Sequence, residues 1–148
     1  MLEIQLYRMM KPFKIEPTNV SPKIFYDIKK HHFEIGGFSR MENVRAFYQD
    51  FFDWFDKNKA EILSTINPST KLHIELHLIY FNSASLKCFL DILLQFKKLY
   101  STNDGKGSLY NIEVFWYFEE GDEDMIEVGE DYSDVIEIPF TFVESKSK

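Results

Sequence analysis

The sequence has a single cysteine, Cys88, so no disulfide can form within the chain, and we expect a reducing compartment, the cytoplasm. No apolar run approaches the roughly 18 residues that a membrane-spanning helix needs, so we expect no membrane insertion. Basic residues are fewer than acidic residues, 17 against 24, which gives a net charge of −7. This balance argues against a general nucleic-acid binder, because contacts with phosphates need clustered lysine and arginine.

Catalytic sequence motifs are also missing. The chain contains no Walker loop, no G-x-G-x-x-G loop and no G-x-S-x-G elbow. Cys88 lies in a predicted helix, where a lone cysteine is usually inert packing. We therefore expect no enzymatic activity, no catalytic residue and no cofactor.

What remains is typical of one globular domain. The 148 residues are 45% hydrophobic and 28% charged, close to globular averages. We expect a lead-in over residues 1–11, one domain over 12–144 and a tail over 145–148. Charge is uneven along the chain: residues 1–110 hold 15 basic and 12 acidic side chains, whereas residues 111–148 hold 2 basic and 12 acidic ones.

Apolar periodicity predicts an α/β fold. Ser39 and Glu42 form an S-x-x-E capping box that predicts the start of a long helix ending near Asn58. A second long helix follows residues 82–85, and a short one is predicted over 125–135. Alternating or short apolar runs predict strands at 23–28, at 32–35 (ending at Gly36-Gly37), at 72–80, at 112–118 and at 138–142, with a turn at 103–107. A strand–helix–strand crossover through 72–118 should be parallel, so we expect a mixed sheet with the helices packed mainly on one face.

One predicted strand carries three side chains that could bind a metal. His73, Glu75 and His77 alternate, so they point to one face, and imidazole with carboxylate suits zinc or a related ion. The alternative is a solvated sheet face whose polar residues simply alternate with the core. His31 and His32 lie in the predicted hairpin turn, where we expect exposure.

The last quarter of the chain contains an acidic turn made of Glu119, Glu120, Asp122, Glu123 and Asp124. It lacks the twelve-residue spacing of an EF-hand loop, although oxygen ligands suit calcium or magnesium. It could instead dock a basic partner, because complementary charge raises association rates, or be a solvated acidic face.

Hydroxyl residues stand between the predicted central strand and the second long helix, in the segment Asn82-Ser83-Ala84-Ser85-Leu86-Lys87. Asn82 and the serines are natural N-caps, which is the simplest interpretation. A phosphate on Ser83 would also meet free backbone N–H groups and the positive end of the helix dipole, with Lys87 one turn away. Ser85 is the alternative acceptor.

The same segment resembles the strand–N-[ST]-x-S-x-K–helix signature of the SiaC family of bacterial regulatory phosphoproteins. Similar blocks are Ser21–Ile24, Gly37–Asn43, Val114–Phe118, Gly121–Met125, Glu127–Tyr132 and Ile138–Phe140, so the resemblance covers about residues 12–144. It implies a STAS-like fold in which Ser83, at the position where the family typically has threonine, is phosphorylated by a cognate serine/threonine kinase and dephosphorylated by a PP2C-type phosphatase. It also implies that the unmodified protein binds an effector, such as a diguanylate cyclase.

Overall fold

The computed structural model describes residues 11–103 and 108–146. Residues 1–10 of the predicted lead-in, residues 147–148 of the predicted tail, and most of the turn predicted at 103–107 lie outside the described residues. The elements, in chain order, are β1 (Phe13–Ile15), β2 (Lys23–Asp27), β3 (His32–Ser39), α2 (Val44–Ser64), β4 (Leu72–Phe81), α3 (Ser83–Leu99), β5 (Ser101–Asn103), β6 (Ser108–Tyr110), β7 (Ile112–Glu119), α4 (Glu123–Ile136) and β8 (Phe140–Ser145). No helix within these ranges is long and apolar enough to cross a bilayer.

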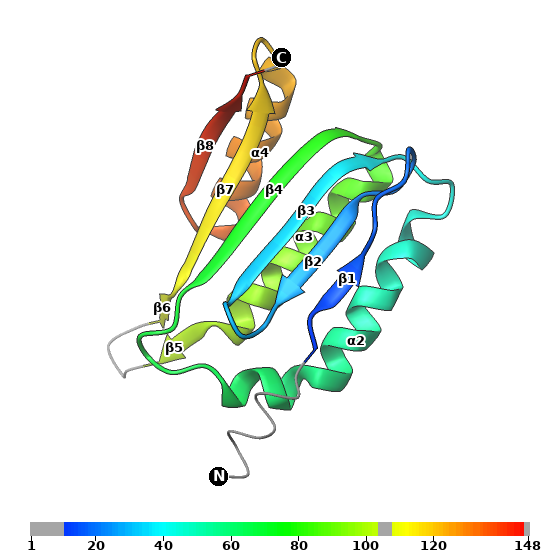
Figure 1. Ribbon diagram of the computed structural model, residues 1–148. Helices are drawn as coiled ribbons and strands as arrows, with labels where there is room; N and C mark the ends of the chain where they lie inside the picture. The colour runs from blue at the N-terminus through cyan, green and yellow to red at the C-terminus, as the bar shows by residue number, and fades with distance from the viewer. Residues whose placement is uncertain (1–10, 104–107, 147–148) are drawn as a thin grey trace.

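Six strands form one mixed sheet in the order β1-β2-β3-β4-β7-β8, and β5 and β6 form a separate two-stranded ribbon (Figure 1). The first three strands pair antiparallel, and the pairs β3–β4, β4–β7 and β7–β8 are parallel. Each parallel pair is joined by a crossover that contains a helix, the usual connection between parallel strands. The predicted mixed sheet and the parallel crossover through residues 72–118 are therefore confirmed.

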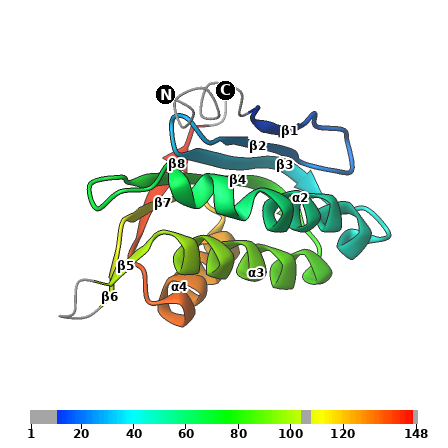
Figure 2. The same ribbon diagram turned by 90° about the horizontal axis from the view of Figure 1, so that it is seen from below.

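All three helices cover the same face of the sheet, as predicted (Figure 2). Buried and more exposed residues alternate along β4. The buried residues lie beneath the helices, and the intervening residues face the other side; the buried ones are Leu72, Ile74, Leu76 and Leu78. No helix of the described residues lies over that other side of the sheet, which we call the open face and which carries many polar side chains, such as His73, Glu75 and His77 of β4.

The core between sheet and helices is largely aromatic. Phe51 of α2, Phe33 of β3 and Phe96 of α3 are fully buried, and each contacts the other two rings at centroid distances of 4.7–6.1 Å. Phe13 extends this cluster from β1, a strand that the sequence pattern did not predict, and packs edge-on against Phe51. Packing of this kind fixes the helices α2 and α3 on the sheet.

The predicted capping box is wrong. Ser39 is the last residue of β3, and α2 begins at Val44 with Asn43 as its cap, whose side chain accepts a hydrogen bond from the Ala46 amide. Strand pairing overrides the local signal, because Ser39 lies in register with Phe81 of β4. The helix also extends to Ser64, beyond the predicted end at Asn58.

The predicted strand end at Gly36-Gly37 is also wrong, because β3 continues to Ser39. Gly37 adopts a φ of 106°, and the β3–β4 register shifts between Gly37 and Phe38. Glycine tolerates this left-handed conformation, so the strand passes through an irregularity and continues.

Helix α4 confirms the predicted short helix and is slightly longer. Asp122 caps its first turn by accepting a hydrogen bond from the Met125 amide at 3.2 Å. Gly129, unfavourable inside a helix, has a packing role: a Cβ there would lie 2.7 Å from ring atoms of Trp116 and Phe142. Close contact between α4 and the sheet therefore requires glycine at this position.

Candidate functional site

The junction between β4 and α3 presents Ser83 at the surface. Asn82 is in an extended conformation and caps α3, and its Oδ1 accepts a hydrogen bond from the Ser85 amide at 3.1 Å. Ser83 is the first residue of the helix and its side chain is exposed. Within the described part of the chain, no group is hydrogen-bonded to the Ser83 hydroxyl. This serine is accessible for modification.

Ser85 occupies the opposite environment, since it is fully buried. Its Oγ lies 2.7 Å from Asn82 Oδ1 and 2.7 Å from Ser39 Oγ, and Ser39 Oγ in turn lies 2.7 Å from the Tyr48 hydroxyl. Burial raises the pKa of Tyr48 above its usual value, although the hydrogen bond with Ser39 opposes that shift. Ser85 thus belongs to a buried hydroxyl network, which ties the start of α3 to β3 and α2.

A shallow hollow of about 480 Å³ lies on the α2 side of the junction. Ala84 lines it together with Lys87, Arg45, Cys88 and Asp91. Lys87 is exposed one turn after Ser83, as predicted, and Arg45 is already paired with Asp91 at 3.1 Å. Burial raises the pKa of the Cys88 thiol, against the opposing effect of Arg45. The thiol is therefore not activated.

The other side of the junction is apolar. Ile79 and Tyr80, near the end of β4, are 46% and 50% exposed, an unusual state for large hydrophobic side chains close together. They line a second hollow, of about 290 Å³, together with Phe81, Asp122, Asp124, Met125 and Val128. Because β4 and β7 are parallel, the acidic turn after β7 lies at the same edge of the sheet as Ser83.

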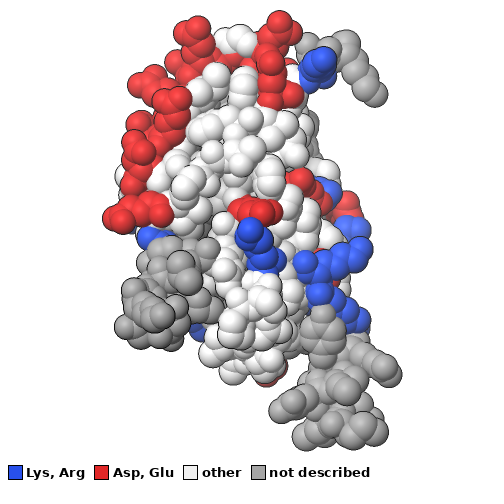
Figure 3. All heavy atoms as spheres, turned by 90° about the vertical axis from the view of Figure 1, so that its left-hand side faces the viewer, with Lys and Arg blue, Asp and Glu red and all other residues white. Residues whose placement is uncertain are grey.

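Acidic side chains gather over the part of the surface that α4 and this turn form (Figure 3). Glu120, Glu123 and Asp124 are exposed, whereas Glu119 and Asp122 are half-buried and Asp122 is committed to capping α4. Within residues 11–103 and 108–146, the acidic turn does not bring three ligand atoms close enough for a metal ion.

The predicted metal triplet is only partly assembled. His73 Nε2 and Glu75 Oε1 lie 3.2 Å apart on the open face, but His77 stacks on Tyr117 and its Nε2 lies 3.0 Å from Ser145 Oγ. The group that does converge within the described residues is His32, Glu34 and Glu75, on two neighbouring strands.

Sequence reasoning therefore missed His32 and Glu34 as candidate metal ligands. His32 is the first residue of β3, and both His31 and His32 are half-buried, so their predicted exposure is wrong. The signal was present, because His32 and Glu34 alternate in the same way as His73 and Glu75, but the pairing of the two strands was not known.

Solved structures share this fold. The chain is similar to crystallised SiaC from Pseudomonas aeruginosa in its apo form (TM-score 0.69, 22% identity, covering 90% of this chain and 99% of that chain). It is equally similar to SiaC in the structure of the diguanylate cyclase SiaD in complex with its activator SiaC (TM-score 0.70, 22% identity, the same coverage). In sequence it is 24% identical over 131 residues to an uncharacterized protein of Pseudomonas aeruginosa strain UCBPP-PA14, covering 88% of this chain and 94% of that protein.

The family model of SiaC family regulatory phosphoproteins matches residues 15–145. This chain belongs to that family, and the resemblance noted in the sequence is confirmed.

Proposed function

We propose that this protein is a non-enzymatic partner switch controlled by phosphorylation of Ser83. A cognate serine/threonine kinase adds the phosphate and a PP2C-type phosphatase removes it, both in the cytoplasm. The unmodified protein binds an effector, such as a diguanylate cyclase. The observation that carries the proposal is the contrast at one helix start: Ser83 is exposed, whereas Ser85 is completely buried.

Position favours Ser83 as the acceptor. A phosphate on the first residue of α3 meets the positive end of the helix dipole and backbone N–H groups that lack a helical partner. Lys87, four residues later, is exposed on the same side of the helix and can pair with the phosphate. Ser85 is hydrogen-bonded in the core, so a kinase would have to unfold the start of α3 to reach it.

The surroundings explain how a phosphate would change binding. Ile79 and Tyr80 form an exposed apolar surface beside the junction, and such surfaces typically bind a partner protein. A phosphate adds about −1.5 to −2 charges at neutral pH. Placed beside this apolar surface, at the same edge of the sheet as the acidic turn, that charge would have to be desolvated in the complex, so binding would weaken.

The relatives support the proposed effector class. One SiaC of the same fold forms a complex with a diguanylate cyclase, which it activates. Since this chain belongs to the same family, a cyclase is the natural first partner to test. The acidic surface made of Glu119, Glu120, Asp122, Glu123 and Asp124 would then face a basic region of a partner, with Asp122 also capping α4.

The acceptor is tested on protein purified from its source organism. Intact mass and peptide mapping should show one phosphate, on Ser83. Ser83→Ala should abolish the modification, and a Ser83→Thr variant should retain it. A phosphate found only on another residue, or none under any growth condition, would refute the assignment.

The switch itself is tested by titrating a diguanylate cyclase from the same organism with variants. Ser83→Asp should bind at least about tenfold more weakly than Ser83→Ala, which corresponds to about 1.4 kcal/mol. Ser69→Asp is the matched control, because it adds the same charge at an exposed loop residue between α2 and β4. Equal affinities of Ser83→Asp and Ser83→Ala for the cyclase would count against the mechanism.

A further inference from the structure

The open face of the sheet carries ordered rows of polar side chains across four strands. Strand pairing places His32 beside His73, and Glu34 beside Glu75. The first row continues on one side with Asp27 of β2 and on the other with Glu113 of β7. Two imidazoles and several carboxylates from strands far apart in the sequence therefore lie side by side.

Three of these side chains converge. One ligand atom from each of His32, Glu34 and Glu75 lies within 4.8 Å of the other two, and His32 Nε2 is 3.7 Å from Glu75 Oε2. These side chains are only 26–30% exposed, so they are held against the sheet. Around a tetrahedral ion with bonds of about 2.0–2.2 Å, ligand atoms stand roughly 3.3 Å apart, so shifts of about 1 Å would complete a site.

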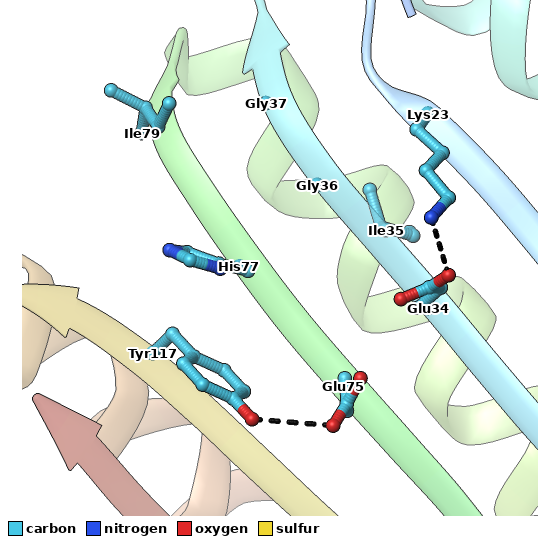
Figure 4. A pocket seen from close by; sticks show the side chains of 9 residues that line it. All are labelled: Lys23, Glu34, Ile35, Gly36, Gly37, Glu75, His77, Ile79 and Tyr117. Carbon is cyan, nitrogen blue, oxygen red and sulfur yellow. Dashed lines mark hydrogen bonds and ion pairs between the residues drawn. The ribbon is translucent and has the colours of Figure 1, made fainter. Parts of the chain in front are cut away.

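The Glu75 carboxylate is already oriented by the contacts of its second oxygen. Glu75 Oε1 lies 3.2 Å from His73 Nε2 and accepts a hydrogen bond from the Tyr117 hydroxyl at 3.2 Å, which leaves Oε2 directed toward His32. Residues that orient a ligand in this way are typical of real metal sites. Glu34, Glu75 and Tyr117 also line a hollow of about 330 Å³ on this face, which gives room for water ligands (Figure 4).

We propose that His32, Glu34 and Glu75 bind one divalent transition-metal ion of the Zn²⁺ type on the open face. One imidazole and two carboxylates suit Zn²⁺ and its first-row neighbours, and water from the hollow completes the coordination. His73 is a positioning residue, because it holds Glu75 by hydrogen bond and stacks on the His32 ring at 5.0 Å. The site is independent of the switch at Ser83.

A lysine competes with the ion. Lys23 Nζ lies 2.6 Å from Glu34 Oε1, and both residues line the hollow (Figure 4). An ammonium group neutralises the same carboxylate that the metal needs. Removing the ammonium group should therefore raise the affinity for the ion, whereas removing a ligand should lower it. We expect the Lys23→Gln variant to bind the ion more tightly.

The experiment is a titration of chelator-treated full-length protein with Zn²⁺ against a chromogenic chelator, repeated with Co²⁺ to record its visible absorption. We expect one ion per chain. His32→Ala and Glu75→Gln should each lower the affinity on the order of tenfold or more, and His73→Phe roughly tenfold. His77→Ala is the matched control on the same strand and face, and its affinity should equal that of the unmodified sequence.

Three outcomes would overturn the site. They are no stoichiometric binding of Zn²⁺ or Co²⁺, an affinity unchanged by both His32→Ala and Glu75→Gln, or a loss with His77→Ala as large as with His32→Ala. The last would favour a site on β4 alone. Circular dichroism of each variant separates a lost ligand from a lost fold. None of these measurements involves Ser83, so either proposal can fail without the other.

Discussion

The buried hydroxyl network at the start of α3 allows a quantitative test of how the junction is held. Ser39, Tyr48 and Ser85 are all fully buried, and within the described residues every buried side-chain nitrogen or oxygen has a hydrogen-bond partner. Ser39 is the central member, because its Oγ lies 2.7 Å from both other hydroxyls. Removing it should therefore cost more than one hydrogen bond.

Ser39→Ala leaves the buried Tyr48 hydroxyl without that partner, a penalty of about 1–3 kcal/mol in the free energy of unfolding. Tyr48→Phe leaves Ser39 with Ser85 as a partner and should cost less, about 0.5–1.5 kcal/mol. The double variant removes both members of the bond, so nothing remains unsatisfied there. Its cost should fall below the sum of the single costs by roughly 1 kcal/mol.

Urea unfolding followed by far-ultraviolet circular dichroism measures the four free energies. Ser64→Ala, at an exposed serine at the end of α2, is the control and should change stability by less than about 0.5 kcal/mol. Additivity of Ser39→Ala and Tyr48→Phe within about 0.3 kcal/mol would refute the reasoning, because uncoupled residues share no hydrogen bond.

Two further substitutions test other parts of the fold. Gly129→Ala, which would stabilise an ordinary helix by about 1 kcal/mol, should destabilise this protein by about 1–3 kcal/mol, because its Cβ would overlap Trp116 and Phe142. Burial lowers the pKa of His31 below 6.5, against the opposing effect of Asp27. As the pH falls, the unfolded chain therefore binds the proton before the folded chain does, and the stability of the fold declines. His31→Asn should flatten this decline between pH 7 and 5.

Controls for these two variants are available in the same chain. Glu130→Ala changes the neighbouring exposed position of α4 and should leave stability almost unchanged, so a Gly129→Ala protein as stable as Glu130→Ala would contradict the packing argument. Asparagine suits position 31 because His31 has a φ of 50°, a conformation that asparagine tolerates. An unchanged pH slope in His31→Asn would mean that other groups cause the decline.

Local patterns predicted the elements well where one face of an element meets the core. The alternation in residues 72–80 identified β4, because burial beneath helices follows the period of a strand. The cap-forming residues after β4 correctly predicted the start of α3. The same signal failed at Ser39, where pairing with β4 and the bonds to Tyr48 and Ser85 extend the strand past a sequence that favours a helix start.

For the candidate sites too, local features could be predicted from sequence and features that depend on strand pairing could not. The position of Ser83 at a helix start could be predicted from sequence, because a helix start is a local feature. The cluster on the open face could not, because it depends on strand pairing between His32 and His73, which are separated by the whole of α2. Which of the histidines in β4 takes part is decided by the neighbouring strand, and no spacing within β4 carries that information.

The uneven charge of the chain affects how the protein is oriented as it approaches a charged partner. Net charge is +3 over residues 1–110 and −10 over residues 111–148. In the folded protein, the acidic side chains lie over α4 and its preceding turn (Figure 3). Such a molecule has a large permanent electric dipole. In the field of a basic partner, the protein will rotate until the α4 side faces that partner. The sheet edge that holds Ser83 is then turned toward the partner at the first encounter, and this orienting effect is stronger at low salt.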